Sequence, residues 1–200
     1  WSSDVCSSDL APNNFREYLV YARANPGKVN FGTSGQGGSG HLGAAWLHGL
    51  AKAQVTFIHY KGSGPQLLDL AAGRVDVTVV NLFGALPLIK AGKVKPIVNL
   101  DERRARTYPD LATVAEQGIK EYGFYNWLGI AAPTGTPPAI IGKLSNAFAS
   151  VVKMPEVAGP IEAQGVEMVG SAPEVLRNLV HVEVERWRKV ARENDIKAGE

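Results

Sequence analysis

The chain has 200 residues, of which 45% are hydrophobic and 20% charged, and its formal net charge is +2. This composition is typical of a globular protein with a sizeable core and excludes a disordered chain. The small net charge and the lack of basic runs with interleaved aromatic residues argue against nucleic-acid binding. No apolar stretch is long enough to span a bilayer, so we expect no direct membrane insertion.

The first segment, residues 1–11, repeats Ser-Ser-Asp and has no clear hydrophobic period. We interpret it as polar low-complexity sequence, either a leader or a foreign junction. The single cysteine, Cys6, excludes an internal disulfide. From Asn13 onward, apolar residues at helical spacing predict a helix that ends at Asn25-Pro26-Gly27.

A glycine-rich stretch, Phe31–Gly43, follows a short apolar run and precedes a segment with helical spacing that extends to about Ala53. This order predicts a strand, a tight turn and a helix. The first N–H groups of a helix have no intrahelical partner, and the helix dipole favours negative charge there, so the turn suits an anion. A carboxylate fits the available backbone and side-chain donors, which are those of Thr33, Ser34, Gly35, Gly37, Gly38 and Ser39.

The same turn satisfies the dinucleotide-binding pattern Gly35-x-Gly37-x-x-Gly40, which keeps an oxidoreductase as the alternative hypothesis. That fingerprint requires an acidic residue about 20 positions later, at the end of the next strand. Here the strand at 55–59 runs into Tyr60-Lys61, which includes no carboxylate. We therefore favour a small anion over a nucleotide.

Strands and helices alternate through the next part of the chain. Strands are predicted at 55–59, 75–80 and 94–100, and helices at 66–72, 82–90 and near 111–117. This alternation predicts a mainly parallel α/β sheet, in which ligands bind beyond the carboxyl ends of the strands. We expect three strand-end segments to converge there, namely Thr33–Ser39, Tyr60–Gly64 and Asn81.

The pattern changes near Gly123, where we place a boundary between two lobes. Beyond it we expect an extended run at 127–132, helices at 140–152, 156–164 and 173–194, and a short strand at 166–169.

Catalytic and metal chemistry find little support in the sequence. The four histidines are scattered without a carboxylate at ligand spacing, and no Gly-x-Ser-x-Gly motif is present. We expect no catalytic residue, no metal site, no cofactor and no enzymatic activity. The Tyr60 phenol either donates to a bound carboxylate or covers the end of the sheet.

The chain resembles the Bug-type solute-binding receptors of tripartite tricarboxylate transporters from Pro12 to about Ile196. The matching motifs include Asn25-Pro26-Gly27-Lys28, Gly32-Thr33-Ser34-Gly35 with His41-Leu42, Tyr60-Lys61-Gly62-Ser63, Gly73-Arg74-Val75-Asp76-Val77, Asn81-Leu82 and Trp127-Leu128-Gly129. The chain departs from the family at two positions. Gly38 stands where the family often has serine, and Val80 stands where it has aspartate.

The resemblance implies a type II periplasmic-binding-protein-like α/β fold, with one near-complete lobe and the C-terminal part of the other. Residues 12–122 would form the ligand-binding lobe, and residues 123–200 would contribute to the first lobe. It implies a periplasmic receptor that captures a small carboxylate for a membrane permease, with His41, Tyr60, Lys61 and Asn81 added to the ligand-binding residues of the turn. We expect the chain to be an N-terminally truncated receptor in which neither the signal peptide nor the other lobe's ligand loop is present.

Overall fold

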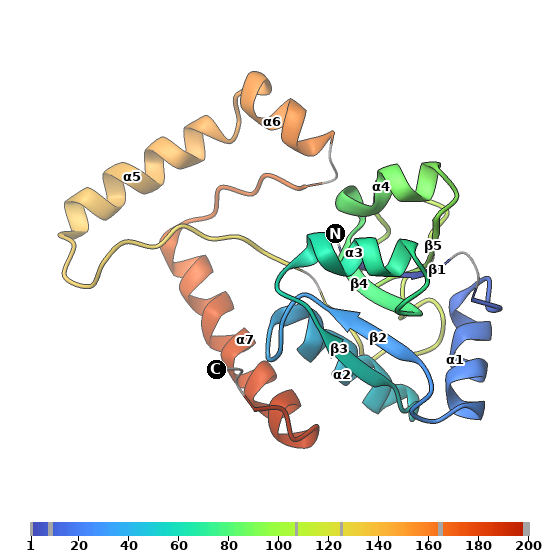
Figure 1. The fold of residues 1–200 in the computed structure, drawn as a ribbon. Coiled ribbons are helices and arrows are strands. Elements are labelled where there is room, and N and C mark those ends of the chain that lie inside the picture. The colour runs from blue at the N-terminus through green and yellow to red at the C-terminus, as the bar shows by residue number, and fades with distance from the viewer. Residues whose placement is uncertain (1, 8–9, 107, 125, 164–165, 198–200) are drawn as a thin grey trace. The chain divides into compact units, whose positions relative to one another are not determined.

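The computed structural model describes residues 2–7, 10–106, 108–124, 126–163 and 166–197 (Figure 1). Its elements in chain order are β1 (Ser2–Ser7), α1 (Phe15–Ala24), β2 (Asn30–Thr33), α2 (Ser39–Ala51), β3 (Thr56–His59), α3 (Ser63–Ala71), β4 (Val77–Asn81), α4 (Leu82–Lys90), β5 (Val94–Asn99), α5 (Pro138–Val151), α6 (Pro155–Glu162) and α7 (Pro173–Glu193). They form two compact units. Unit 1 comprises Trp1–Asn126 and Lys189–Glu200, and unit 2 comprises Trp127–Arg188.

Unit 1 is built on a five-stranded sheet in the order β3-β2-β4-β1-β5. β2 is parallel to β3 and β4, whereas β1 is antiparallel to both β4 and β5. The expected parallel direction is therefore confirmed for the four strands from β2 to β5. The sheet is thus mainly parallel, as expected. The prediction missed β1, because Ser2–Ser7 form an antiparallel strand inside the sheet where the sequence indicated only low-complexity polar residues.

Helices cover both faces of this sheet (Figure 1). On one face the ring of Phe31 in β2 packs edge-on against His48 of α2, with ring centroids 5.1 Å apart. On the other face a cluster of Val5, Leu70, Val75, Val80, Ala85 and Val94 joins α3 and α4 to the strands. Successive strand residues point to opposite faces, so this two-sided burial explains the near-continuous apolar run of β4.

A buried amide, that of Gln66 in α3, connects the helix to two strands. Its Nε2 donates to the carbonyl oxygens of Gly32 in β2, at 3.1 Å, and Val79 in β4, at 3.2 Å. It also contacts the hydroxyl of Thr78, which itself donates to Gly32 O at 2.8 Å. Gln66 and Thr78 are fully buried, so these bonds satisfy the amide nitrogen and the hydroxyl where water cannot reach them, whereas Gln66 Oε1 has no hydrogen-bond partner among the described residues.

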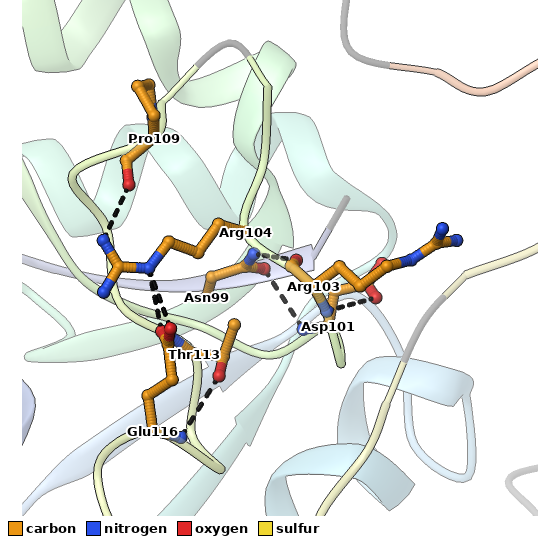
Figure 2. A network of polar contacts seen from close by, with 7 residues as sticks. All are labelled: Asn99, Asp101, Arg103, Arg104, Pro109, Thr113 and Glu116. Atoms are coloured by element: carbon orange, nitrogen blue, oxygen red, sulfur yellow. Dashed lines mark hydrogen bonds and ion pairs between the residues drawn. The ribbon is translucent and has the colours of Figure 1, made fainter.

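The segment after β5 is held by side-chain hydrogen bonds (Figure 2). Thr113 N donates to Glu116 Oε2 at 2.8 Å while Glu116 N donates to Thr113 Oγ1 at 3.2 Å, which is the reciprocal pattern of a helix start. Arg104 Nε also pairs with the Glu116 carboxylate, at 2.9 Å. The predicted short helix near 111–117 is nevertheless wrong, because the chain turns at Gly118, with φ +107, before a helix can continue.

Unit 2 contains α5, α6 and most of α7. Neither α5 nor α6 has a buried residue. The helices predicted here are confirmed to within a few residues, but residues 166–169 form no strand. Gln164, the predicted end of the second helix, lies outside the described residues.

Candidate functional site

The glycine-rich turn joins β2 to α2, as the sequence predicted. β2 ends at Thr33, whose side chain is fully buried, and α2 begins at Ser39 with Gly38 as its N-cap residue. Gly37 has φ +71, a left-handed conformation that favours glycine. Gly40 is required for another reason: a Cβ atom there would lie 2.9 Å from Val79 Cγ1, so α2 could not pack as closely on β4.

A second loop, Tyr60–Gly62, joins β3 to α3 beside the first. Parallel pairing places His59 opposite Thr33 in the sheet, so both strands end at the same level. Beyond the strands, Tyr60 N donates to Thr33 O at 2.8 Å and Gly62 N donates to Ser34 O at 3.1 Å. These backbone bonds fix the two loops to each other.

A pocket of about 480 Å³ lies between these loops. Its lining residues are Ser34, Gly35, Gln36, His59, Tyr60, Lys61 and Gly62. Four of these residues were predicted as ligand-binding. Gln36 and Gly62 lie within the two segments that were expected to converge, and only His59 was missed altogether. The strand register could have identified His59, because it is the neighbour of Thr33 across the sheet.

The other predicted site residues lie outside this lining. Thr33 is buried beneath the turn, and Gly37, Gly38, Ser39 and His41 form the turn's end and the first turn of α2. Asn81 lies at the end of β4, where its Oδ1 accepts a hydrogen bond from Asn126 Nδ2 at 3.2 Å. The structure thus brings together two of the three strand-end segments, and Asn81 is not part of that pocket.

Two histidines lie in and behind the pocket wall. His59 Nδ1 is 2.7 Å from Thr33 Oγ1, and the His41 ring packs against the His59 ring with centroids 4.5 Å apart. Burial, followed by the nearby charge of His59, lowers the pKa of His41 from 6.5 to about 4. Burial also lowers the pKa of His59. Both rings are therefore neutral at neutral pH, and Lys61 is the cationic side chain of the lining.

The Tyr60 hydroxyl points to a protein partner. It donates to Asp69 Oδ2 at 2.9 Å, and Asp69 pairs with Arg74 at 2.5 Å. Hydrogen bonding from Arg74 and then from Tyr60 lowers the pKa of the Asp69 carboxyl, which therefore stays ionised as the acceptor. Because the single hydroxyl proton of Tyr60 is used in this way, Tyr60 contributes its backbone and ring to the pocket wall.

The groups in and around the pocket are of a kind that suits an anion. Its walls lead directly into the starts of α2 and α3, where backbone N–H groups are unpaired within the helices. Within the described ranges, Ser34 forms no hydrogen bond with a histidine or carboxylate that could act as a base. The described residues also include no group of three His, Cys, Asp or Glu placed to hold a metal ion. Over the same residues, no helix combines the length and apolar character needed to cross a bilayer.

Comparison with solved structures supports the fold. R. palustris Rpa4515 with adipate superimposes with a TM-score of 0.90 at 30% identity, covering 99% of this chain and 66% of that one. The periplasmic binding protein BugD matches with a TM-score of 0.87 at 27% identity, covering 99% of this chain and 67% of its own. MatC from Rhodopseudomonas palustris with bound malate has a TM-score of 0.84 at 28% identity, and the match covers 94% of this chain and 65% of MatC. The mixed α/β fold is that of periplasmic binding proteins.

Sequence comparison gives the same result. A protein from Pseudomonas sp. strain P51, described as a UPF0065 protein in the tcbD-tcbE intergenic region, is 32% identical over 98% of this chain and 59% of its own length. The Bordetella pertussis protein BugT is 31% identical over 96% of this chain and 59% of its own length. The chain thus spans about three fifths of the length of these relatives.

The family model for the tripartite tricarboxylate transporter family receptor matches residues 3–196. The match includes residues 3–11, where we expected no counterpart in the family. Since it covers nearly the whole chain, the protein belongs to the tripartite tricarboxylate transporter receptor family, as its motifs indicated.

Proposed function

We propose that this chain is the ligand-binding part of a periplasmic receptor that captures a small carboxylate and delivers it to the permease of a tripartite transporter. The observation that supports this most directly is the pocket between the loops after β2 and β3, whose lining includes the α3 N-cap residue Gly62 and the cationic Lys61, both of which suit an anion. Related structures carry adipate and malate, which are both dicarboxylates. We therefore propose a dicarboxylate as the first class of ligand to test.

The proposed site extends the pocket lining by the residues that shape it. In this proposal the lobe at 12–122 holds the ligand, and residues 123–200 contribute to the other lobe. Ser34, Gly35 and Lys61 face the ligand directly, whereas Thr33, Gly37 and Gly38 hold the turn. Asn81 would meet the ligand only if the bound molecule extended beyond the pocket.

The function proposed is binding without turnover. The family is one of transporter receptors, and no base or metal group accompanies Ser34 among the described residues. The oxidoreductase alternative finds no support, because β3 ends at His59 with no carboxylate for a ribose, and the relatives are binding proteins. Recovery of a chemically altered acid after prolonged incubation would contradict this conclusion.

A substitution at Gly35 tests the placement of the ligand. Gly35 lines the pocket, its φ is not in the left-handed region, and a Cβ atom there would meet nothing within 4 Å. Gly35→Val should therefore leave the fold intact while its side chain occupies space that the carboxylate needs. Loss of about one charge-assisted hydrogen bond predicts roughly tenfold weaker binding or more. Gly37→Val would be a poorer test, because φ +71 strains a valine whatever the ligand does.

The measurement is calorimetric titration of adipate, malate and citrate, with NAD as the nucleotide control. Gly84→Val is the matched control, because Gly84 lies in α4 and a Cβ atom there would also meet nothing within 4 Å. We expect binding of at least one acid, weakened by Gly35→Val alone. Equal binding by both variants would refute the placement, and binding of NAD without any acid would refute the function.

A further inference from the structure

The start of α2 has an unusual cap. Its N-cap residue, Gly38, has no side chain with which to accept a hydrogen bond from the helix. Three residues later, His41 reaches back and its Nδ1 accepts a hydrogen bond from Gly37 N at 3.0 Å. In a capping box, the side chain of the third helical residue accepts a hydrogen bond from a backbone N–H at the helix start. His41 makes a similar bond, with an imidazole nitrogen in place of the usual carboxylate or amide oxygen.

The hydrogen bond holds the residue that shapes the pocket wall. Gly37 has φ +71 and directly follows Gln36, which lines the pocket together with Ser34 and Gly35. Fixing Gly37 therefore fixes the direction in which the chain leaves this wall and enters α2. His41 is itself buried, so it acts on the pocket through the turn.

Packing sets the orientation of the imidazole. The His41 ring lies edge-on to Phe57, with centroids 4.7 Å apart, and at 4.5 Å from His59, both of which belong to β3. His59 is the titratable group whose charge acts on His41. The ring therefore cannot turn away from Gly37 without disturbing the strand beneath it.

The direction of the hydrogen bond defines the protonation state. A backbone N–H only donates, so Nδ1 of His41 must carry a lone pair, and the proton of the neutral ring lies on Nε2. Burial lowers the pKa of His41 to about 4, which keeps this acceptor in place at neutral pH. Protonation would turn Nδ1 into a donor that faces another donor and would release the turn.

We propose that His41 is a positioning residue of the carboxylate pocket: as a neutral Nε2–H imidazole it accepts the Gly37 N–H and holds the Ser34–Gln36 wall in its binding conformation. This inference rests on the proposed carboxylate-binding function. It also changes the role expected from the sequence, because His41 acts on the turn and does not line the pocket.

Two amide variants test the proposal. Asparagine places its Oδ1 near the position of Nδ1, so His41→Asn should keep the acceptor for Gly37. Glutamine places its amide near Nε2, so His41→Gln is a polar control that lacks the acceptor. We expect His41→Gln to weaken adipate or malate binding by about three- to tenfold at pH 7.5, and His41→Asn to stay within about twofold of wild type. Below pH 5, wild type should lose more affinity than His41→Asn, since ligand protonation is common to both.

Nuclear magnetic resonance of the unliganded chain gives an independent result. Nitrogen chemical shifts should show the Nε2–H tautomer of His41, and the Gly37 amide resonance should move in His41→Gln but little in His41→Asn. Equal affinity of both variants, or an Nδ1–H tautomer, would overturn the inference. If wild type binds no carboxylate, the proposed function fails, and the tautomer and the Gly37 resonance still decide whether His41 holds the turn.

Discussion

The two units bury their apolar residues to very different degrees. In unit 1 the side chains of Phe15, Tyr18 and Phe31 are at most 1% exposed. In unit 2, α5 has a regular apolar stripe, yet Ile140, Leu144 and Phe148 are 46%, 45% and 41% exposed. Helical periodicity therefore predicts a helix and its apolar face, but not whether that face is covered. Unit 1 contains both a closed core and the pocket.

The sharpest test of this difference uses the same substitution in both units. Phe31→Ala removes a fully buried ring between α2 and the sheet and should lower the free energy of unfolding by about 3–5 kcal/mol. Phe148→Ala removes a ring that is already largely exposed and should cost below about 1 kcal/mol. Urea unfolding followed by circular dichroism measures both. Similar losses from the two variants would show that α5 has a covered face after all.

Acidic pH should lower the free energy of unfolding of unit 1 because of its buried histidine, His48. His48 accepts from the Tyr18 hydroxyl at Nε2, 2.6 Å away, while its Nδ1 donates to Ala44 O at 2.7 Å. Burial lowers the pKa of His48 from 6.5 to about 4. The unfolded chain then binds the proton more readily than the folded protein does. The stabilisation due to neutral His48 is therefore complete above pH 6.5 and is lost as the pH falls toward 4. The loss by pH 4.5 should be about 2 kcal/mol.

Urea unfolding at pH 7 and pH 4.5 checks this prediction. His48→Gln is the informative variant, because glutamine can still accept from Tyr18 but does not titrate. We expect His48→Gln to lose clearly less stability between pH 7 and pH 4.5 than the wild type does. The remaining loss would be due to groups such as His41. An unchanged acid loss would mean that His48 is not the group responsible.

Glycine to alanine changes should have opposite signs in the two units. Gly40→Ala places a methyl group 2.9 Å from Val79 Cγ1, and we expect this overpacking to destabilise unit 1 by about 1–2 kcal/mol. Gly142→Ala in α5 meets nothing within 4 Å and should stabilise its helix by about 0.5–1 kcal/mol. Melting temperatures of the two variants give the signs directly. A stabilising Gly40→Ala would show that α2 can shift away from β4.

Much of unit 1 could be predicted from local sequence signals. The bounds of α4, Leu82–Lys90, are as predicted, and the glycine turn lies between a strand and a helix as expected. These features depend on short-range rules of periodicity, capping and turn chemistry. The loops after β2 and β3 also converge, because parallel strands end at one edge of the sheet.

The side-chain contacts that could not be predicted from the sequence depend on strand order and on partners far along the chain. Asn81 is the last residue of β4, which lies on the opposite side of β2 from β3, and its side chain is hydrogen-bonded to Asn126, 45 residues away. The phenol of Tyr60 was expected either to donate to ligand or to cover the sheet, but its partner is Asp69. Such contacts follow only once the register and the packing of α3 are known.

The amide of Gln66 has a consequence for how this protein tolerates mutation. Its Nε2 faces three oxygen atoms, two of them carbonyls of the main chain that no side-chain change can remove. Leucine at 66 would remove the amide donor from both carbonyls and leave Gly32 O with the Thr78 hydroxyl, and glutamate would set a carboxylate against these oxygens. A library randomised at Gln66 and at its buried apolar neighbour Leu70 should therefore return many hydrophobic residues at 70 but almost only glutamine at 66. Helix α3 thus has a position whose chemical identity, and not merely its volume, is fixed by the strand backbone that it faces.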